Sequence, residues 1–104
     1  MDEGRRRTRL LVRPDLVPIM PRYVKLRHDK GRDRWVLLAP ERILTPNAIA
    51  IEVLKRCNGI RSVQDIAEDL AKGYDASVDD IIGDVIEMLQ GMADKGYVRA
   101  GAEQ

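Results

Sequence analysis

The chain of 104 residues has no Phe, one Cys and one His. Zinc and iron sites take three or four His, Cys or carboxylate ligands, so Cys57 and His28 are too few for a structural metal site. A single Cys also excludes an intramolecular disulfide, which is typical of a reducing compartment. Glycine-rich phosphate-binding motifs are missing as well. We therefore expect neither a metal nor a cofactor.

Long apolar runs are also missing. The apolar stretches, for example residues 36–39, are far shorter than the roughly 20 residues of a membrane-spanning helix. Five Arg precede Pro14, but the apolar stretch among them covers only residues 10–12, too few for a secretory signal. The sequence predicts a cytoplasmic protein that has no membrane partner.

Aliphatic residues are plentiful. Apolar residues make up 44% of the chain and charged residues 34%, which is enough apolar surface for a folded core. Aromatic residues reach only 4%, so the core is expected to consist of Leu, Ile, Val, Ala and Met. The length suits one small domain.

The charges are distributed unevenly. Residues 1–44 hold 12 Lys and Arg against 6 Asp and Glu, whereas residues 45–104 hold 6 against 11. The net charge of +1 thus conceals a basic first part and an acidic second part. This division indicates two faces that meet different partners, and not a uniformly basic nucleic-acid binder.

The first part of the chain predicts a tail followed by a sheet. Residues 1–20 combine Arg with Pro and have no sustained period, so we expect a flexible basic tail or linker before a domain at 21–100. Alternation places Val24, Leu26 and His28 on the inward side of a strand. The predicted strands of an antiparallel sheet are residues 22–28, 34–39 and 42–44, with the third strand at an edge.

The remainder predicts a three-helix bundle. Three residues are suited to begin helices, because each side chain can accept a backbone hydrogen bond: Thr45, which is followed by Pro46, and the serines Ser62 and Ser77. Glycines and the apolar periodicity place the ends. The predicted helices span residues 46–57, 63–72 and 78–95. The fold class is therefore α+β, a three-stranded antiparallel sheet followed by three helices, similar to a winged helix-turn-helix.

Candidate catalytic groups are poor. Ser62 and Ser77 are explained as helix caps, and a Cys57–His28 dyad is disfavoured because a buried Cys is usually inert. The neighbouring carboxylates Asp79 and Asp80 do not face each other on a helix and suit its first turn instead. The sequence therefore predicts no enzyme.

A winged-helix DNA-binding regulator is an alternative with the same order of elements. The outward face of the helix at 78–95 argues against it, because its carboxylates would repel phosphate. We therefore expect no nucleic-acid partner. The outward acidic residues of this helix are Asp79, Asp80, Asp84, Glu87 and Asp94.

A binding module fits the pattern better. The apolar positions of the helix at 78–95 fill an arc of roughly 160°, which is wider than one neighbouring helix needs. This arc either packs against several elements or lines a groove for an apolar side chain. A short edge strand at 42–44 beside such a groove is what strand addition by a peptide requires.

Several segments resemble the PqqD family of pyrroloquinoline quinone biosynthesis. They are Trp35-Val36-Leu37-Leu38-Ala39-Pro40-Glu41-Arg42, Cys57-Asn58-Gly59, Ser62-Val63-Gln64-Asp65-Ile66, Asp84-Val85-Ile86-Glu87-Met88-Leu89 and Lys95-Gly96-Tyr97-Val98. The resemblance covers about residues 21–98. Thr45-Pro46-Asn47 departs from it, since a more acidic helix start without proline is expected there.

The resemblance implies a non-catalytic peptide chaperone. Such a protein binds the ribosomal precursor peptide PqqA and presents it to the radical S-adenosylmethionine enzyme PqqE. It also implies fusion or association with PqqC, for which residues 1–20 would be a linker, with Met20 as the native start as the alternative. We expect a monomer in solution. A recognition domain for another modified peptide is the alternative. The implied peptide site is Arg42, Ile43, Leu44 and Thr45 on the edge strand, with Ile81, Asp84, Val85 and Met88 on the helix at 78–95.

Overall fold

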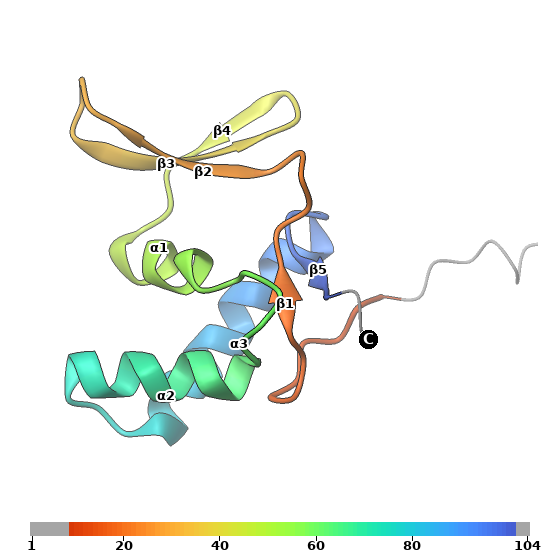
Figure 1. Cartoon of the computed structure of the whole chain (residues 1–104), viewed down its shortest axis with the longest axis vertical. Coiled ribbons are helices and arrows are strands. Elements are labelled where there is room, and N and C mark those ends of the chain that lie inside the picture. The colour runs from red at the N-terminus through yellow and green to blue at the C-terminus, as the bar shows by residue number, and fades with distance from the viewer. Residues whose placement is uncertain (1–8, 102–104) are drawn as a thin grey trace, which may run out of the picture.

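The protein, described here by a computed structural model over residues 9–101, separates a sheet from a group of helices (Figure 1). The three-stranded sheet lies at one end of the molecule, and the helices follow it in the chain. A second, two-stranded sheet lies beside the helices. The predicted α+β class, with an antiparallel sheet before three helices, is confirmed.

The larger sheet consists of β2 (Lys25–Asp29), β3 (Arg34–Ala39) and β4 (Arg42–Leu44), antiparallel and in that order. The predicted edge position of the strand at 42–44 is confirmed. The first strand begins later than predicted, because residues 21–24 form a turn in which Val24 donates its N–H to Pro21.

His28 corrects the prediction of an inward side chain. It belongs to the face of Leu26, but it lies next to the last residue of β2, beside the hairpin turn, and it is exposed. Its ring centroid lies 5.3 Å from that of Trp35, and its Nε2 lies 3.3 Å from a carboxylate oxygen of Asp33. A dyad with Cys57 is therefore excluded, since Cys57 is buried on the helical side.

The three helices are α1 (Ala48–Lys55), α2 (Val63–Tyr74) and α3 (Val78–Asp94). Ser62 and Ser77 cap α2 and α3 as predicted. The start of α1 differs, because the cap is Asn47, whose side chain accepts from the N–H of Ala50, and not Thr45. Pro46 disfavours helical backbone at the residue before it, so the helix begins only after the proline.

The ends of the helices shift by one or two residues. α1 ends at Lys55, so Cys57 follows the helix. α2 continues through Gly73, and Asp75 closes it in the left-handed conformation, with a φ of 54°. A left-handed residue after a helix commonly satisfies its last carbonyls, and Asp is one of the residues that tolerate this backbone.

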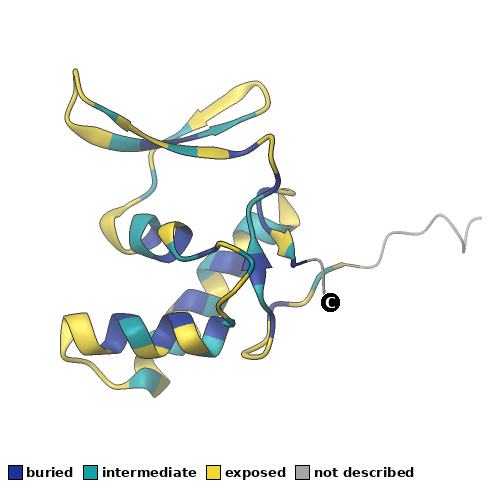
Figure 2. Cartoon of the chain, in the orientation of Figure 1, coloured by how far each residue is buried: buried dark blue, intermediate teal, exposed yellow. Residues whose placement is uncertain are grey.

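The core lies mainly among the three helices and the segments beside them, and Leu37 joins it from the inner face of the sheet (Figure 2). It is mainly aliphatic, as the composition predicted, because Phe is missing and Trp35 lies outside the buried set. Burial of each such side chain contributes roughly 1.5–3 kcal/mol. Its largest fully buried side chains include Leu37, Leu54, Ile66, Leu70 and Leu89.

The segment before residue 21 corrects the expected tail. Val12 and Leu16 are buried, and β1 (Pro18–Ile19) pairs with β5 (Arg99–Ala100). The carbonyl of Leu16 also accepts the N–H of Val63 at 2.8 Å. Residues 9–20 are thus part of the packed domain, because their apolar side chains and backbone groups find partners in it. The rest of the expected tail, residues 1–8, lies outside the described residues.

Two features of the described chain bear on its surroundings. No helix within residues 9–101 is long and apolar enough to cross a membrane. The same residues contain no group of three or more His, Cys, Asp or Glu placed to hold a metal ion.

Candidate functional site

The edge strand β4 presents an open side. Among the described strands, only β3 pairs with it. Ile43 pairs with Leu38 and is 69% exposed, whereas Leu44 pairs with Leu37 and packs against the core. Arg42 and Thr45 are exposed. The strand is therefore held to the core by Leu44, while its free backbone edge and the apolar side chain of Ile43 are exposed.

The hairpin that carries β4 is tight. Pro40 and Glu41 form its two-residue turn, and Glu41 adopts a φ of 61°. An open hollow of about 550 Å³ lies here, lined by Leu38, Ala39, Glu41, Arg42 and Ile43. Apolar surface thus continues around the exposed end of the edge strand.

A groove of about 350 Å³ lies beyond the other end of β4. Three residues separate Leu44 from Ala48, so the wall supplied by α1 begins close to the strand. The opposite wall comes from α3. The groove is lined by Asn47, Ile49, Ala50, Asp84, Glu87 and Met88.

The residues predicted on α3 divide into three groups. Asp84 and Met88 both line the groove, one helical turn apart. Ile81 is half-buried and packs against the core, and it is not part of the groove lining. Val85 is only 1% exposed, so its side chain belongs to the core and is not open to a ligand.

The sequence prediction missed the α1 wall and Glu87. One signal was available in the sequence, since Ile49 lies beside the apolar side formed by Ala50, Val53 and Leu54. In the structure Ile49 is 38% exposed. An isoleucine outside the inward side of an amphipathic helix marks a second apolar contact. Glu87 lies one turn from Asp84 and was interpreted only as part of an outward acidic face.

The surroundings of β4 carry opposite charges on two sides. Strand alternation and the pairing register place Lys25, Leu38 and Ile43 in one row on the outer face of the sheet. Arg27 extends this basic face, and it is exposed like Lys25. The groove beyond the strand is acidic through Asp84 and Glu87.

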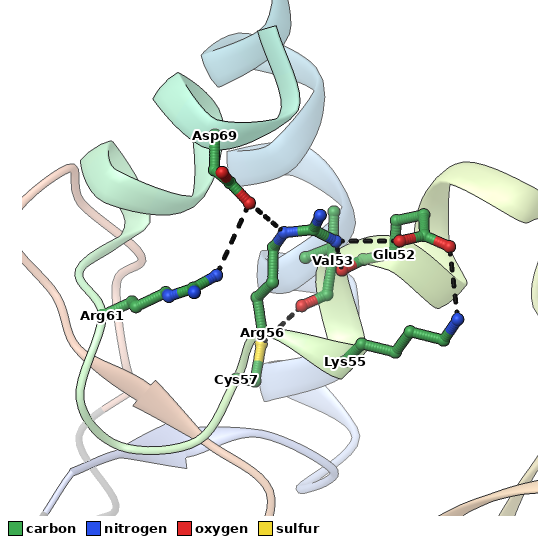
Figure 3. Close-up of polar contacts among 7 residues, drawn as sticks. All are labelled: Glu52, Val53, Lys55, Arg56, Cys57, Arg61 and Asp69. Carbon is green, nitrogen blue, oxygen red and sulfur yellow. Dashed lines mark hydrogen bonds and ion pairs between the residues drawn. The ribbon is translucent and has the colours of Figure 1, made fainter. Parts of the chain in front are cut away.

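An ion-pair network fixes the position of α1 against α2 (Figure 3). Arg56 donates to Asp69 at 2.6 Å and to the carboxylate of Glu52 at 2.9 Å. These hydrogen bonds to Arg56 hold the pKa values of both carboxyl groups below their usual range. Arg61 approaches Asp69 at 3.5 Å. The wall of the groove supplied by α1 is thereby held in place.

A second contact connects α1 with the sheet. The Nζ atom of Lys55 lies 4.5 Å from the centroid of a Trp35 ring, which is within the range of a cation–π interaction. Trp35 lies on β3, the partner of β4. The contact therefore helps to set the sheet relative to the helix that forms the groove.

Cys57 does not provide a nucleophile. It is 3% exposed, and its thiol donates to the carbonyl of Val53. Burial raises the pKa of the thiol to about 12, so the thiolate is scarce at neutral pH. The interpretation of Cys57 as an inert core residue agrees with this placement.

Residues 34–98 match the family model described as coenzyme PQQ synthesis protein D (PqqD). This range contains β3, β4 and all three helices, and hence the edge strand and the groove. The chain belongs to the PqqD family. The resemblance seen in the sequence is confirmed.

Curated relatives extend the similarity beyond that range. A PqqA binding protein of Bradyrhizobium diazoefficiens is 51% identical over 87 residues, which cover 84% of each chain. A PqqA binding protein of Xanthomonas oryzae pv. oryzae is 44% identical over 85 residues, covering 82% of this chain and 92% of the relative.

Two solved structures share the fold. The solution NMR structure of the PqqD truncation of Methylobacterium extorquens PqqCD is 40% identical, with a TM-score of 0.74 over 85% of this chain and 94% of the other. That truncation is described as a functional, stand-alone recognition element for ribosomally synthesized and post-translationally modified peptides. The crystal structure of PqqD from Xanthomonas campestris is also 40% identical, with a TM-score of 0.54 over 85% and 98% of the two chains.

Proposed function

We propose that this PqqD-family protein binds the precursor peptide PqqA along β4 and presents it to the radical S-adenosylmethionine enzyme PqqE. The observation that carries the proposal is an open edge strand that leads into a groove between α1 and α3. The relatives support the ligand, since they are named PqqA binding proteins. Their names describe binding and not catalysis, in keeping with a non-catalytic chaperone.

Strand addition explains how an edge of only three residues captures a peptide. Along a strand of an antiparallel pair, one residue directs both its N–H and its C=O toward the partner strand, and the next residue directs both away from it. Since Ala39 and Arg42 flank a two-residue turn and pair with each other, we expect Ile43 to turn its N–H and C=O to the open side. A peptide strand finds a donor and an acceptor there.

The mechanism is one of positioning. PqqA bound along β4 loses conformational freedom before it meets the enzyme, and this order reduces the number of orientations in which its side chains reach the active site. The hydrogen bond from Arg56 to Asp69 holds α1 against α2, and the contact of Lys55 with Trp35 holds the sheet against α1. Together they keep the groove at a fixed position relative to β4. The exposed basic face at Lys25 and Arg27 favours acidic residues of the same peptide.

The proposed assembly also includes PqqC. The solved relative from Methylobacterium is a truncation of a PqqCD protein, so a domain of this fold occurs there together with PqqC. We place the binding event in the cytoplasm, because a ribosomally made peptide is first available there. The proposed oligomeric state is a monomer, in which the edge of β4 is free for the peptide.

The decisive experiment is a titration of isotope-labelled protein with synthetic PqqA, followed by backbone amide shifts. We expect the shifts to cluster at residues 42–45 and at 84–88. Duplex DNA serves as the negative control. A folded domain without shifts at high PqqA concentration would exclude PqqA as the ligand, and a leader peptide of another pathway that produces the shifts would identify the alternative.

Replacing Ile43 with Pro tests the strand-addition geometry. Proline is tolerated on an edge strand when its missing N–H faces solvent, so the fold should persist while the donor to the peptide is lost. The matched control Ile43→Val retains the N–H and most of the side chain. We expect binding to be lost in the first variant and retained in the second. Equal affinities of two folded variants would exclude main-chain capture at this position.

A further inference from the structure

We propose that Asp84 and Glu87 select a basic residue in the captured peptide, placed on the N-terminal side of the segment that pairs with β4. This inference rests on the proposed function and adds to it a direction and a charge order for the bound peptide. It concerns the groove beyond Leu44, where both carboxylates contribute to the lining.

The groove suits a lysine or arginine side chain. Its apolar surface comes from Ile49, Ala50 and Met88, and both charged groups that line it are acidic. A long basic side chain places its methylene groups over apolar surface and its charged end at carboxylates. Asn47, the remaining polar residue of the lining, is uncharged and caps α1 by accepting from the N–H of Ala50, so Asp84 and Glu87 are the charged acceptors that the groove offers.

Both carboxylates are available. Across the described residues, ion pairs engage Asp69, Glu52 and Asp94, but neither Asp84 nor Glu87. Positions three apart on a helix lie on one face, so their negative charges repel each other in the free protein. A bound cationic side chain would relieve this repulsion, and the groove would therefore favour a basic residue over an acidic one.

The pairing of the sheet sets the direction of the peptide. β2, β3 and β4 are all antiparallel to their neighbours, and continuing that pattern places the peptide antiparallel to β4. β4 runs from Arg42 toward the groove, so the N-terminal part of an antiparallel peptide lies over Asp84 and Glu87. Its C-terminal part lies near Arg42. A peptide with a basic residue in its N-terminal part and acidic residues in its C-terminal part is therefore complementary to the carboxylates of the groove and to Arg42.

The test is a set of affinities measured by fluorescence anisotropy with labelled PqqA at low and high salt. The protein variant Asp84→Lys/Glu87→Lys reverses the groove charge. Each basic residue of PqqA that precedes the β4-contacting segment is replaced by Glu in turn. We expect the protein variant to bind unchanged PqqA roughly tenfold more weakly at low salt, as two partly exposed ion pairs would predict. A charge-reversed peptide should restore most of the affinity.

A control variant separates the groove from overall charge. Glu68→Lys/Asp79→Lys changes the net charge equally, and neither residue lines the groove. Its affinity for PqqA should stay within about twofold of wild type, and circular dichroism should show that all variants are folded. Unchanged binding by the groove variant, equal weakening by the control variant, or the absence of any rescuing peptide would each overturn the inference.

The inference and the proposed function fail in different ways. If wild-type protein does not bind PqqA, or if Ile43→Pro binds as wild type does, strand capture of PqqA is excluded. If wild type binds PqqA through β4 and the groove variant binds equally well, strand capture stands and charge selection by Asp84 and Glu87 is excluded.

Discussion

The Nε atom of Arg56 donates a hydrogen bond to Oδ2 of Asp69 over 2.6 Å, which joins the end of α1 to the middle of α2 (Figure 3). The same guanidinium donates through Nη1 to the main-chain carbonyl of Glu52 at 2.7 Å and to its carboxylate. Arg56 thus closes α1 and fixes it to its neighbour. Because α1 forms one wall of the groove, these contacts connect the stability of the domain with the shape of its candidate site.

Replacing Arg56 with Met should lower the free energy of unfolding by about 1 kcal/mol, since the stem is retained and the charged hydrogen bonds are lost. For a domain of this size, the midpoint of thermal unfolding should fall by about 4–8 °C. Arg22→Met is the matched control, because Arg22 is exposed. Equal midpoints for the two variants, measured by calorimetry, would show that the network adds nothing to stability.

The same network makes stability depend on pH in the acid range. The pKa values of Asp69 and Glu52 lie below their ordinary values in the folded protein, mainly because of their hydrogen bonds to Arg56. Their contribution is therefore complete above about pH 5, where both carboxyl groups are ionised in the unfolded chain as well, and is lost as the pH falls through the lower folded values. The stability difference between wild type and Arg56→Met should shrink between pH 7 and about pH 2. Urea unfolding at each pH measures it, and a constant difference would contradict the assignment.

Cys57 should be unreactive in the folded protein. Its burial and a thiol pKa of about 12 keep the thiolate scarce at neutral pH. An aromatic disulfide reagent at pH 7.5 should modify less than about a tenth of the protein under native conditions and one thiol per chain in concentrated urea. Rapid modification of native protein would mean that the end of α1 opens readily.

Much of the architecture was predictable from local patterns. The capping serines before α2 and α3 and the apolar periodicity after them placed both helices, because cap and period act within a few residues. The start of α1 was harder, since Thr45 and Asn47 both suit a cap and only the backbone around Pro46 decides between them. Gly83 and Gly91 have open space where a side chain would lie, so packing does not explain them.

Long-range contacts were not predictable from local patterns. β1 and β5 are two residues each and lie at opposite ends of the chain, so neither has a periodicity to detect. The groove was predicted in part, because Asp84 and Met88 lie on the correct face of α3. The sequence did not show that Val85 faces the core instead, since the apolar arc of α3 serves both the interior and the groove.

Residues 9–19 should be required for stability, contrary to the expected tail. Their Val12 and Leu16 side chains are buried, and the carbonyl of Val17 accepts the N–H of Gly101 at 2.7 Å. Two buried aliphatic side chains contribute about 3 kcal/mol or more. A chain that begins at residue 20 should therefore be less stable by at least about 3 kcal/mol than one that begins at residue 9. Similar urea midpoints for the two chains would contradict the packing of this segment.

Val85 and Met88 should separate folding from binding, although both lie on α3. Val85→Ala removes buried methyl groups and should cost about 2 kcal/mol of stability, with the PqqA affinity of the folded protein unchanged. Met88→Ala removes half-buried apolar surface from the groove, so its PqqA affinity should fall by about threefold to tenfold with a smaller loss of stability. Thermal unfolding and anisotropy titrations on both variants measure the two effects. If Val85→Ala weakens binding as much as Met88→Ala does at a temperature where both are folded, the peptide contacts a rearranged α3, and the groove of the free protein is not its binding surface.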